Sequence, residues 1–213
     1  MVRRANKKQR RGYSRKERKV MLVATEGNNK TERTYFSEFN RMQKEWHIVP
    51  TAGNSTDPVG IIKDAIRTMN NRGINIDYGD SAFAVFDTDF GKEKQIADAR
   101  KIARKNGVEL ALSNPCFEVW LLQHFRYSTR GYGSNDDVVS ELKNRWPDYH
   151  KNIASFHYLS DRTGIAIDNS KKLLEFHETV NRGGSIENMN PSSDVYKLVE
   201  IIMPKGDDEK DNE

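Results

Sequence analysis

The sequence predicts an α/β fold, with an open sheet of about four mainly parallel strands flanked by helices and followed by a C-terminal helical extension. Apolar runs of strand length are separated by segments in which apolar residues recur every three or four positions, as on one face of a helix. Strands joined through helices need crossover connections, and these make neighbouring strands parallel. The four runs of strand length are residues 20–25, 46–51, 81–86 and 108–112.

The first predicted strand, 20–25, ends at Glu26-Gly27-Asn28-Asn29, whose composition is typical of a turn. A helix is predicted over 30–44, with Glu32 in its first turn, where an acid opposes the helix dipole. Its apolar face is formed by Tyr35, Phe36, Phe39 and Met42.

Two more helices connect the remaining strands. After a loop at 53–58, a helix runs to Gly73, and a second helix over 92–106 ends at Gly107. The third strand, 81–86, is closed by Asp87-Thr88-Asp89 between these two helices.

The second half of the chain is predicted to be mostly helical. Asn114 and Pro115 suit the N-cap and first position of a helix after the fourth strand. Further helices are predicted over 136–145, 165–180 and 193–203. The expected organisation is a disordered basic arm (1–19), an α/β core (20–126), a helical extension packing on the core (127–204) and an acidic disordered tail (205–213).

Composition limits the class of protein. The 213 residues suit one domain with appendages, and 36% hydrophobic residues are enough for a packed core. A single cysteine, Cys116, excludes a disulfide framework and a Cys-built zinc site. No apolar run reaches the roughly 18 residues of a membrane span, so we expect a cytoplasmic protein without a membrane partner.

Positive charge is concentrated at the N-terminus. Residues 1–19 contain ten lysines and arginines and a single acid, Glu17. Such an arm suits contacts with phosphate groups of a nucleic acid, although a solubilising terminus with no specific partner accounts for it equally well. The candidate nucleic-acid-binding residues are Arg3, Arg4, Lys7, Lys8, Arg10 and Arg11.

Acidic residues follow the ends of the predicted strands. Glu26 follows the first strand, Asp87 and Asp89 follow the third, and Glu118 lies just beyond the fourth. Ligands of open parallel sheets bind at this edge, and residues at i and i+2 of an extended chain point to one side. Clustered carboxylates repel one another, so they favour a hard cation, and we expect Mg²⁺ or Mn²⁺.

The same acids are compatible with roles apart from a nuclease metal site. Acids are common in turns after strands, and Glu32 and Glu118 also suit the first turns of helices. A phosphatase of the haloacid dehalogenase type would use Asp87 as its nucleophile, but its Asp-x-Asp motif follows the first core strand rather than the third. No P-loop motif is present, so nucleotide hydrolysis by a P-loop is excluded.

Several short motifs follow one another in a distinctive order. They are Glu26-Gly27 with Thr31-Glu32 and Tyr35-Phe36, Asp87-Thr88-Asp89, the block from Ser113-Asn114-Pro115 through Phe117-Glu118 to Trp120-Leu121-Leu122, and Asn190-Pro191-Ser192-Ser193 followed by Lys197-Leu198-Val199-Glu200. In this order the chain resembles the RloB-like family, which includes the abortive-infection protein AbiLii, and its first two acidic motifs resemble the Toprim arrangement of OLD-type nucleases.

The resemblance implies a Toprim-like fold and metal-dependent phosphodiester chemistry. It assigns the metal to Glu26, Asp87 and Asp89, with Glu32 and Glu118 as further ligands, and it gives Glu26 the additional role of general acid or base. Lys197 corresponds to a recurrent lysine that would stabilise phosphoryl charge. The catalytic set is therefore Glu26, Asp87, Asp89 and Lys197.

The expected function is that of a Mg²⁺-dependent Toprim endoribonuclease or nuclease, the effector of an anti-phage abortive-infection system. The resemblance favours RNA over DNA, transfer RNA included, and implies control by a separate ABC-type ATPase. The alternative is a non-catalytic Toprim-like module that binds nucleic acid or the ATPase. Homodimer formation is left open.

Overall fold

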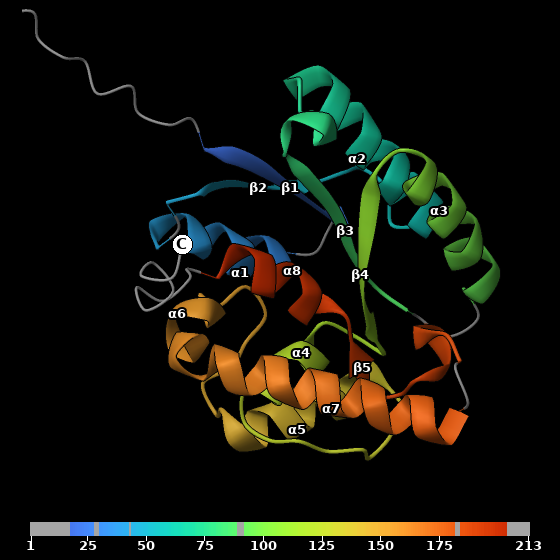
Figure 1. The fold of residues 1–213 in the computed structure, drawn as a ribbon. Helices are drawn as coiled ribbons and strands as arrows, with labels where there is room; N and C mark the ends of the chain where they lie inside the picture. The colour runs from blue at the N-terminus through green and yellow to red at the C-terminus, as the bar shows by residue number, and fades with distance from the viewer. Residues whose placement is uncertain (1–17, 28–29, 43, 89–91, 182–183, 204–213) are drawn as a thin grey trace, which may run out of the picture.

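The computed structural model describes residues 18–27, 30–42, 44–88, 92–181 and 184–203. Within these ranges the chain forms one mixed sheet with helices on both faces (Figure 1). The predicted α/β class is confirmed.

The sheet has five strands in the order β2-β1-β3-β4-β5. Neighbours among the first four strands are parallel, as predicted, and β5 adds a short antiparallel pair at the edge. The strands are β1 (Lys19–Thr25), β2 (Trp46–Ala52), β3 (Ser81–Asp87), β4 (Val108–Asn114) and β5 (Ser192–Ser193).

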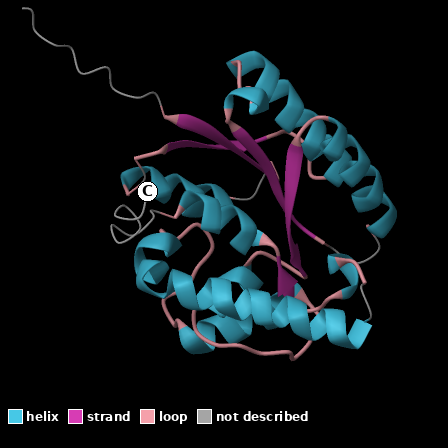
Figure 2. Cartoon of the chain, viewed as in Figure 1, coloured by secondary structure: helices cyan, strands magenta, loops and turns pink. Residues whose placement is uncertain are grey.

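Helices make up most of the remaining described chain (Figure 2). The α-helices are α1 (Thr31–Glu38), α2 (Pro58–Arg72), α3 (Glu93–Lys105), α4 (Glu118–Gln123), α5 (Asn135–Arg145), α6 (Ser155–Leu159), α7 (Thr163–Asn181) and α8 (Val195–Ile202). Short 3₁₀ turns cover Phe39–Arg41, Ile76–Tyr78, Ser160–Arg162 and Ile186–Asn188.

Alternate residues of each central strand enter two different cores. Met21 and Val23 of β1 point to the face covered by α1, α4 and α8, whereas Leu22 and Ala24 point to the face covered by α2 and α3. All four side chains are buried. Burial on both faces explains why these strands are continuous apolar runs rather than alternating ones.

The core on the α1 side is aromatic. Tyr35 is completely buried and makes edge contacts with Phe36, Phe117, Trp120 and other rings. Edge-to-face pairs of this kind add stabilisation beyond the area that they bury. This cluster joins α1 rigidly to α4, and both helices carry candidate site residues.

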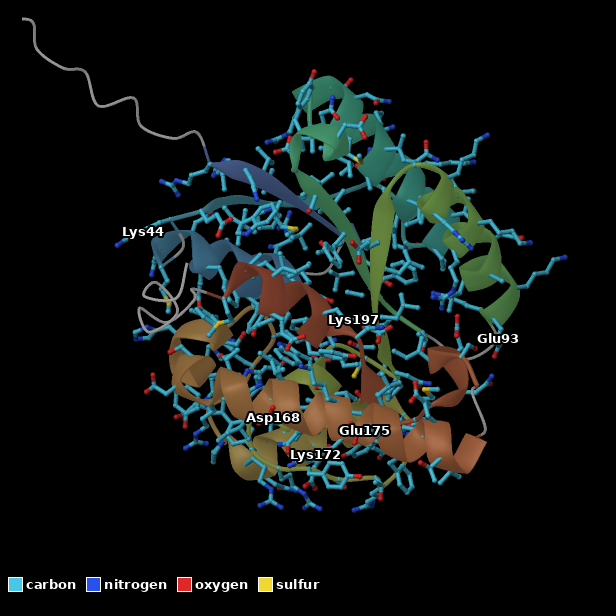
Figure 3. All side chains as sticks on the ribbon, in the orientation of Figure 1. Lys44, Glu93, Asp168, Lys172, Glu175 and Lys197 are labelled. Carbon is cyan, nitrogen blue, oxygen red and sulfur yellow. The ribbon has the colours of Figure 1, made fainter. Side chains whose placement is uncertain are left out.

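The C-terminal segment belongs to the same body as the sheet. The backbone N–H of Asp194 donates to the carbonyl oxygen of Leu112 (2.7 Å), and the hydroxyls of Ser113 and Ser193 are 2.8 Å apart. α8 then lies against the sheet on the aromatic face. The helix α7 covers this layer from outside, and its exposed Asp168, Lys172 and Glu175 are labelled in Figure 3.

Some predicted boundaries were wrong. The helix predicted over 30–44 is shorter, because α1 ends at Glu38 and a 3₁₀ turn follows. Asn114 does not cap a helix: it is the last residue of β4, and its side-chain amide donates to the carbonyl oxygens of Ile186 and Glu187. Lys19, assigned to the arm, is the first residue of β1.

Two predicted segments fall largely outside the described residues. These are the basic arm, of which only Arg18 and Lys19 are described, and the acidic tail. Among the helices that the structure describes, none combines the length and apolar character that a membrane span requires.

The loops that follow β1 and β2 approach each other closely. The N–H of Gly27 donates to the carbonyl oxygen of Ser55 (3.3 Å), and a Cβ added to Gly27 would lie 2.5 Å from the backbone oxygen of Gly53. Such a contact is too short for any side chain, so the loop after Glu26 requires glycine at this position.

We therefore expect Gly27→Ala to lower the free energy of unfolding by about 1–3 kcal/mol, since a backbone oxygen must be displaced. Gly164→Ala in α7 is the control, because nothing lies within 4 Å of its added Cβ. Urea unfolding followed by circular dichroism measures both. Equal losses for the two variants would contradict the proposed steric role of the Gly27 loop.

Candidate active site at the carboxyl edge of the sheet

The carboxyl ends of β1, β3 and β4 meet at one edge of the sheet. In the strand register, Thr25 lies opposite Val85 and Asp87 lies opposite Ser113. Glu26, directly after β1, and Asp87, the last residue of β3, therefore extend beyond the same edge, as the sequence predicted.

Glu32 is the most deeply buried acid of this edge. It lies in the first turn of α1 and is 1% exposed. Burial raises the pKa of its carboxyl group to about 8, and the charges of Glu118 and Glu26 act in the same direction. Lys151 and the backbone N–H of Glu32 oppose the increase without cancelling it. Glu26, Glu32 and Glu118 thus form one electrostatic unit.

Glu118 is held in place by a tyrosine. It is the first residue of α4, is 6% exposed, and its Oε1 accepts a hydrogen bond of 2.8 Å from the hydroxyl of Tyr149. Burial, and then the charge of Glu118, raise the pKa of the Tyr149 hydroxyl. Tyr149 therefore remains a hydrogen-bond donor, which fixes the orientation of the Glu118 carboxylate.

Two of the acids act electrostatically on Cys116. Burial raises the pKa of its thiol, and the charges of Glu118 and Asp87 raise it further. The thiol therefore stays protonated and is not a nucleophile. Because Glu118 and Asp87 both act on this one thiol, both lie within electrostatic reach of Cys116.

The segment between α5 and α6 covers the site from outside the sheet. It carries Tyr149, Lys151 and Asn152, whose N–H lies 3.4 Å from the hydroxyl oxygen of Thr31 on α1. The sequence prediction missed Tyr149 and Lys151. No motif marks them, because they follow Glu118 by about thirty positions and reach it only through tertiary packing.

Lys197 lies elsewhere. It is exposed on α8, where Figure 3 labels it, and its Nζ forms an ion pair of 2.7 Å with Asp194. It lines a cavity of about 440 Å³ together with Val108 and Glu109. Those residues begin β4, whereas the acids follow the carboxyl ends of the strands.

The remaining candidates lie outside the described residues. These are Asp89 and the six basic residues of the arm, Arg3, Arg4, Lys7, Lys8, Arg10 and Arg11. The structure therefore brings together Glu26, Glu32, Asp87 and Glu118 at one edge, whereas Lys197 is paired with Asp194 on α8.

The donor set suits a hard divalent cation. Carboxylate oxygens are the ligands that Mg²⁺ and Mn²⁺ prefer, and a cation would relieve the repulsion between Glu26, Glu32 and Glu118. Among the described residues, no three His, Cys, Asp or Glu side chains converge closely enough to share one ion. This statement does not cover the predicted ligand Asp89, because Asp89 lies outside the described residues.

Comparison with known proteins identifies a family. A family model described as RloB-like protein matches residues 21–202. No curated protein and no solved structure matches the chain.

The raised pKa of Glu32 predicts a pH-dependent stability. Its carboxyl group titrates near 4.5 when unfolded and at about 8 when folded. Between these two values the Glu32 carboxyl is deprotonated in the unfolded chain but still protonated in the folded protein. The free energy of unfolding therefore falls as pH rises, by up to about 1.4 kcal/mol per pH unit. In EDTA, Glu32→Gln should raise the melting temperature by about 5 °C or more at pH 8 and leave it nearly unchanged at pH 4.

Glu93→Gln is the matched control, because Glu93 also lies in a first helical turn but is exposed. It should show no gain that grows with pH. An effect of Glu32→Gln that is equal at pH 4 and pH 8 would show that folding does not raise the pKa of Glu32.

Proposed function

The chain belongs to the RloB-like family, and from this premise and the carboxyl groups at one sheet edge we propose that it is a metal-dependent phosphodiesterase. The proposed activity is that of a Toprim-type nuclease, with RNA favoured over DNA as the substrate. The observation that carries the proposal is the electrostatic unit of Glu26, Glu32 and Glu118 beside Asp87.

Desolvated acids of one sign are an unfavourable arrangement for stability alone. Burying a carboxyl group without a counter-charge costs free energy, and neighbouring carboxylates increase that cost. Such groups are concentrated where function requires them. Lys151 lowers the pKa of Glu32, and the pKa nevertheless stays raised.

The proposed ligands of the cation are Glu26 and Asp87, together with Asp89. Bound there, Mg²⁺ or Mn²⁺ would polarise a phosphoryl oxygen and stabilise the charge that develops on the leaving group. The protein itself orients the acids: Tyr149 holds Glu118, and the Gly27 loop sets the position of Glu26. Protonated Glu32 is a candidate proton donor near neutral pH.

Substrate and partner follow from the same premise. The ten basic residues at the N-terminus suit a phosphate backbone, and the arm residues from Arg3 to Arg11 are proposed to contact it. The chain has no nucleotide-binding motif, which fits an effector controlled by a separate ABC-type ATPase in anti-phage defence. Lys197, which lines a cavity with the first residues of β4, is proposed to contact substrate rather than the reacting phosphate.

Glu26→Ala and Asp87→Ala should each reduce cleavage of labelled transfer RNA by at least about 100-fold, since both remove a proposed metal ligand. Cleavage should require Mg²⁺ or Mn²⁺ and should stop in EDTA. The assay uses the purified full chain, alone and with its ATPase partner, and denaturing gels. Glu175→Gln, at an exposed position of α7, should cleave as the native protein does.

Cleavage that persists in EDTA, or that both alanine variants retain, would contradict the proposal. The alternative is a non-catalytic module that binds nucleic acid or the ATPase. It predicts nucleic-acid binding that is lost on deletion of residues 1–17 and unaffected by changes at Glu26 and Asp87. Hydrolysis of small phosphate esters blocked only by Asp87→Asn would instead indicate a phosphatase.

A further inference from the structure

A stacked aromatic pair flanks the segment that covers the acids. The rings of Trp146 and Tyr158 are nearly parallel, at 5°, with centroids 4.5 Å apart. Trp146 ends α5 and is 2% exposed, whereas Tyr158, on α6, is 55% exposed. One face of the Tyr158 ring therefore packs on Trp146, so the part of the ring exposed to solvent is its other face and its edges.

This pair is connected to the candidate active site through direct contacts. The rings of Trp146 and Tyr149 have centroids 5.4 Å apart, and the Tyr149 hydroxyl donates to Glu118. The exposed ring of Tyr158 is therefore two aromatic side chains away from a carboxylate of the site. Both contacts lie within buried or half-buried structure, so the position of the ring is set by the core.

The stretch of chain that carries the two rings has more basic than acidic residues. Residues 143–162 contain four lysines and arginines and two aspartates. Lys143, His150 and Lys151 are exposed in this stretch, and Lys151 also acts on Glu32. Exposed basic side chains and an exposed flat ring on one stretch of chain are features with which proteins bind single-stranded nucleic acids, because every base has a face that stacks.

We propose that the exposed face of Tyr158 is a stacking platform for an unpaired base of a single-stranded nucleic acid, whose backbone continues toward Glu118. The position given to the nucleic-acid backbone rests on the proposed function. The stacking site itself does not depend on that function. The platform would select unpaired substrate segments, because the bases of a duplex are already stacked on one another.

The test measures binding rather than cleavage. The full chain, in EDTA, is titrated into fluorescein-labelled single-stranded RNA or DNA of about 12 nucleotides, within the site size of such surfaces, and into a duplex of equal length. Tyr158→Leu is the informative variant: leucine still covers Trp146 but offers no flat ring. Alanine would uncover Trp146, which could then stack in place of the tyrosine.

Tyr158→Leu should weaken single-strand binding about tenfold or more, which corresponds to about 1.4 kcal/mol, and should hardly change duplex binding. Tyr158→Phe should bind as the native protein does, since it keeps the ring. Tyr78→Leu is the matched control, because Tyr78 is 86% exposed in the 3₁₀ turn before β3 and lies outside the covering segment.

Salt separates stacking from the contribution of the basic arm. Raising the salt concentration should lower all affinities, but the ratio between native protein and Tyr158→Leu should persist, because stacking releases few counterions. Equal binding by Tyr158→Leu and Tyr78→Leu, or an equal loss for single strands and duplex, would overturn the platform.

The outcome is independent of catalysis. A tenfold selective loss in EDTA supports the platform even if no nuclease activity is found, and the proposed function then fails alone. Loss of cleavage in Asp87→Ala with unchanged binding by Tyr158→Leu would leave the proposed function standing and remove the platform. Far-ultraviolet circular dichroism and thermal melting establish that each variant is folded.

Discussion

The burial of like-charged carboxyl groups at one corner of the sheet is the constraint on which the site depends. Glu32 is almost removed from water, and Glu26 and Glu118 act on it with the same sign. Water cannot screen these charges effectively there, so proton uptake or a cation must reduce the repulsion. The structure tolerates this cost because the surrounding aromatic core and hydrogen bonds hold α1 and α4 in place.

Two layers of the fold supply that support. Parallel strands buried on both faces bring Glu26 and Asp87 to one edge, since the crossover connections return every strand in the same direction. The segment between α5 and α6 then closes over the edge and supplies Tyr149 and Lys151. The Trp146–Tyr158 pair flanks the same segment, so the proposed binding surface adjoins the element that supplies Tyr149 and Lys151.

Sequence reasoning succeeded where periodicity is strong and local. All four parallel strands and the helices between them were predicted, because apolar runs and turn residues mark them directly. It failed at Asn114, where the pair Asn-Pro suggested a helix start but the side-chain amide instead binds the carbonyls of Ile186 and Glu187. Those partners lie about seventy positions away, and no local pattern reveals them. The two-residue strand β5 was missed for the same reason, since it is defined by pairing with β4 alone.

The placement of Glu26 and Asp87 at a common edge could be read from the chain, because it depends only on strands that end in acids and run parallel. The buried and protonated state of Glu32 could not be read from the chain. An acid in a first helical turn is ordinarily a solvated group that opposes the dipole. Its burial, its acidic neighbours and the Tyr149 bond to Glu118 arise from packing between segments remote in sequence. Desolvation depends on everything that surrounds a side chain, so it exists only once the chain has folded.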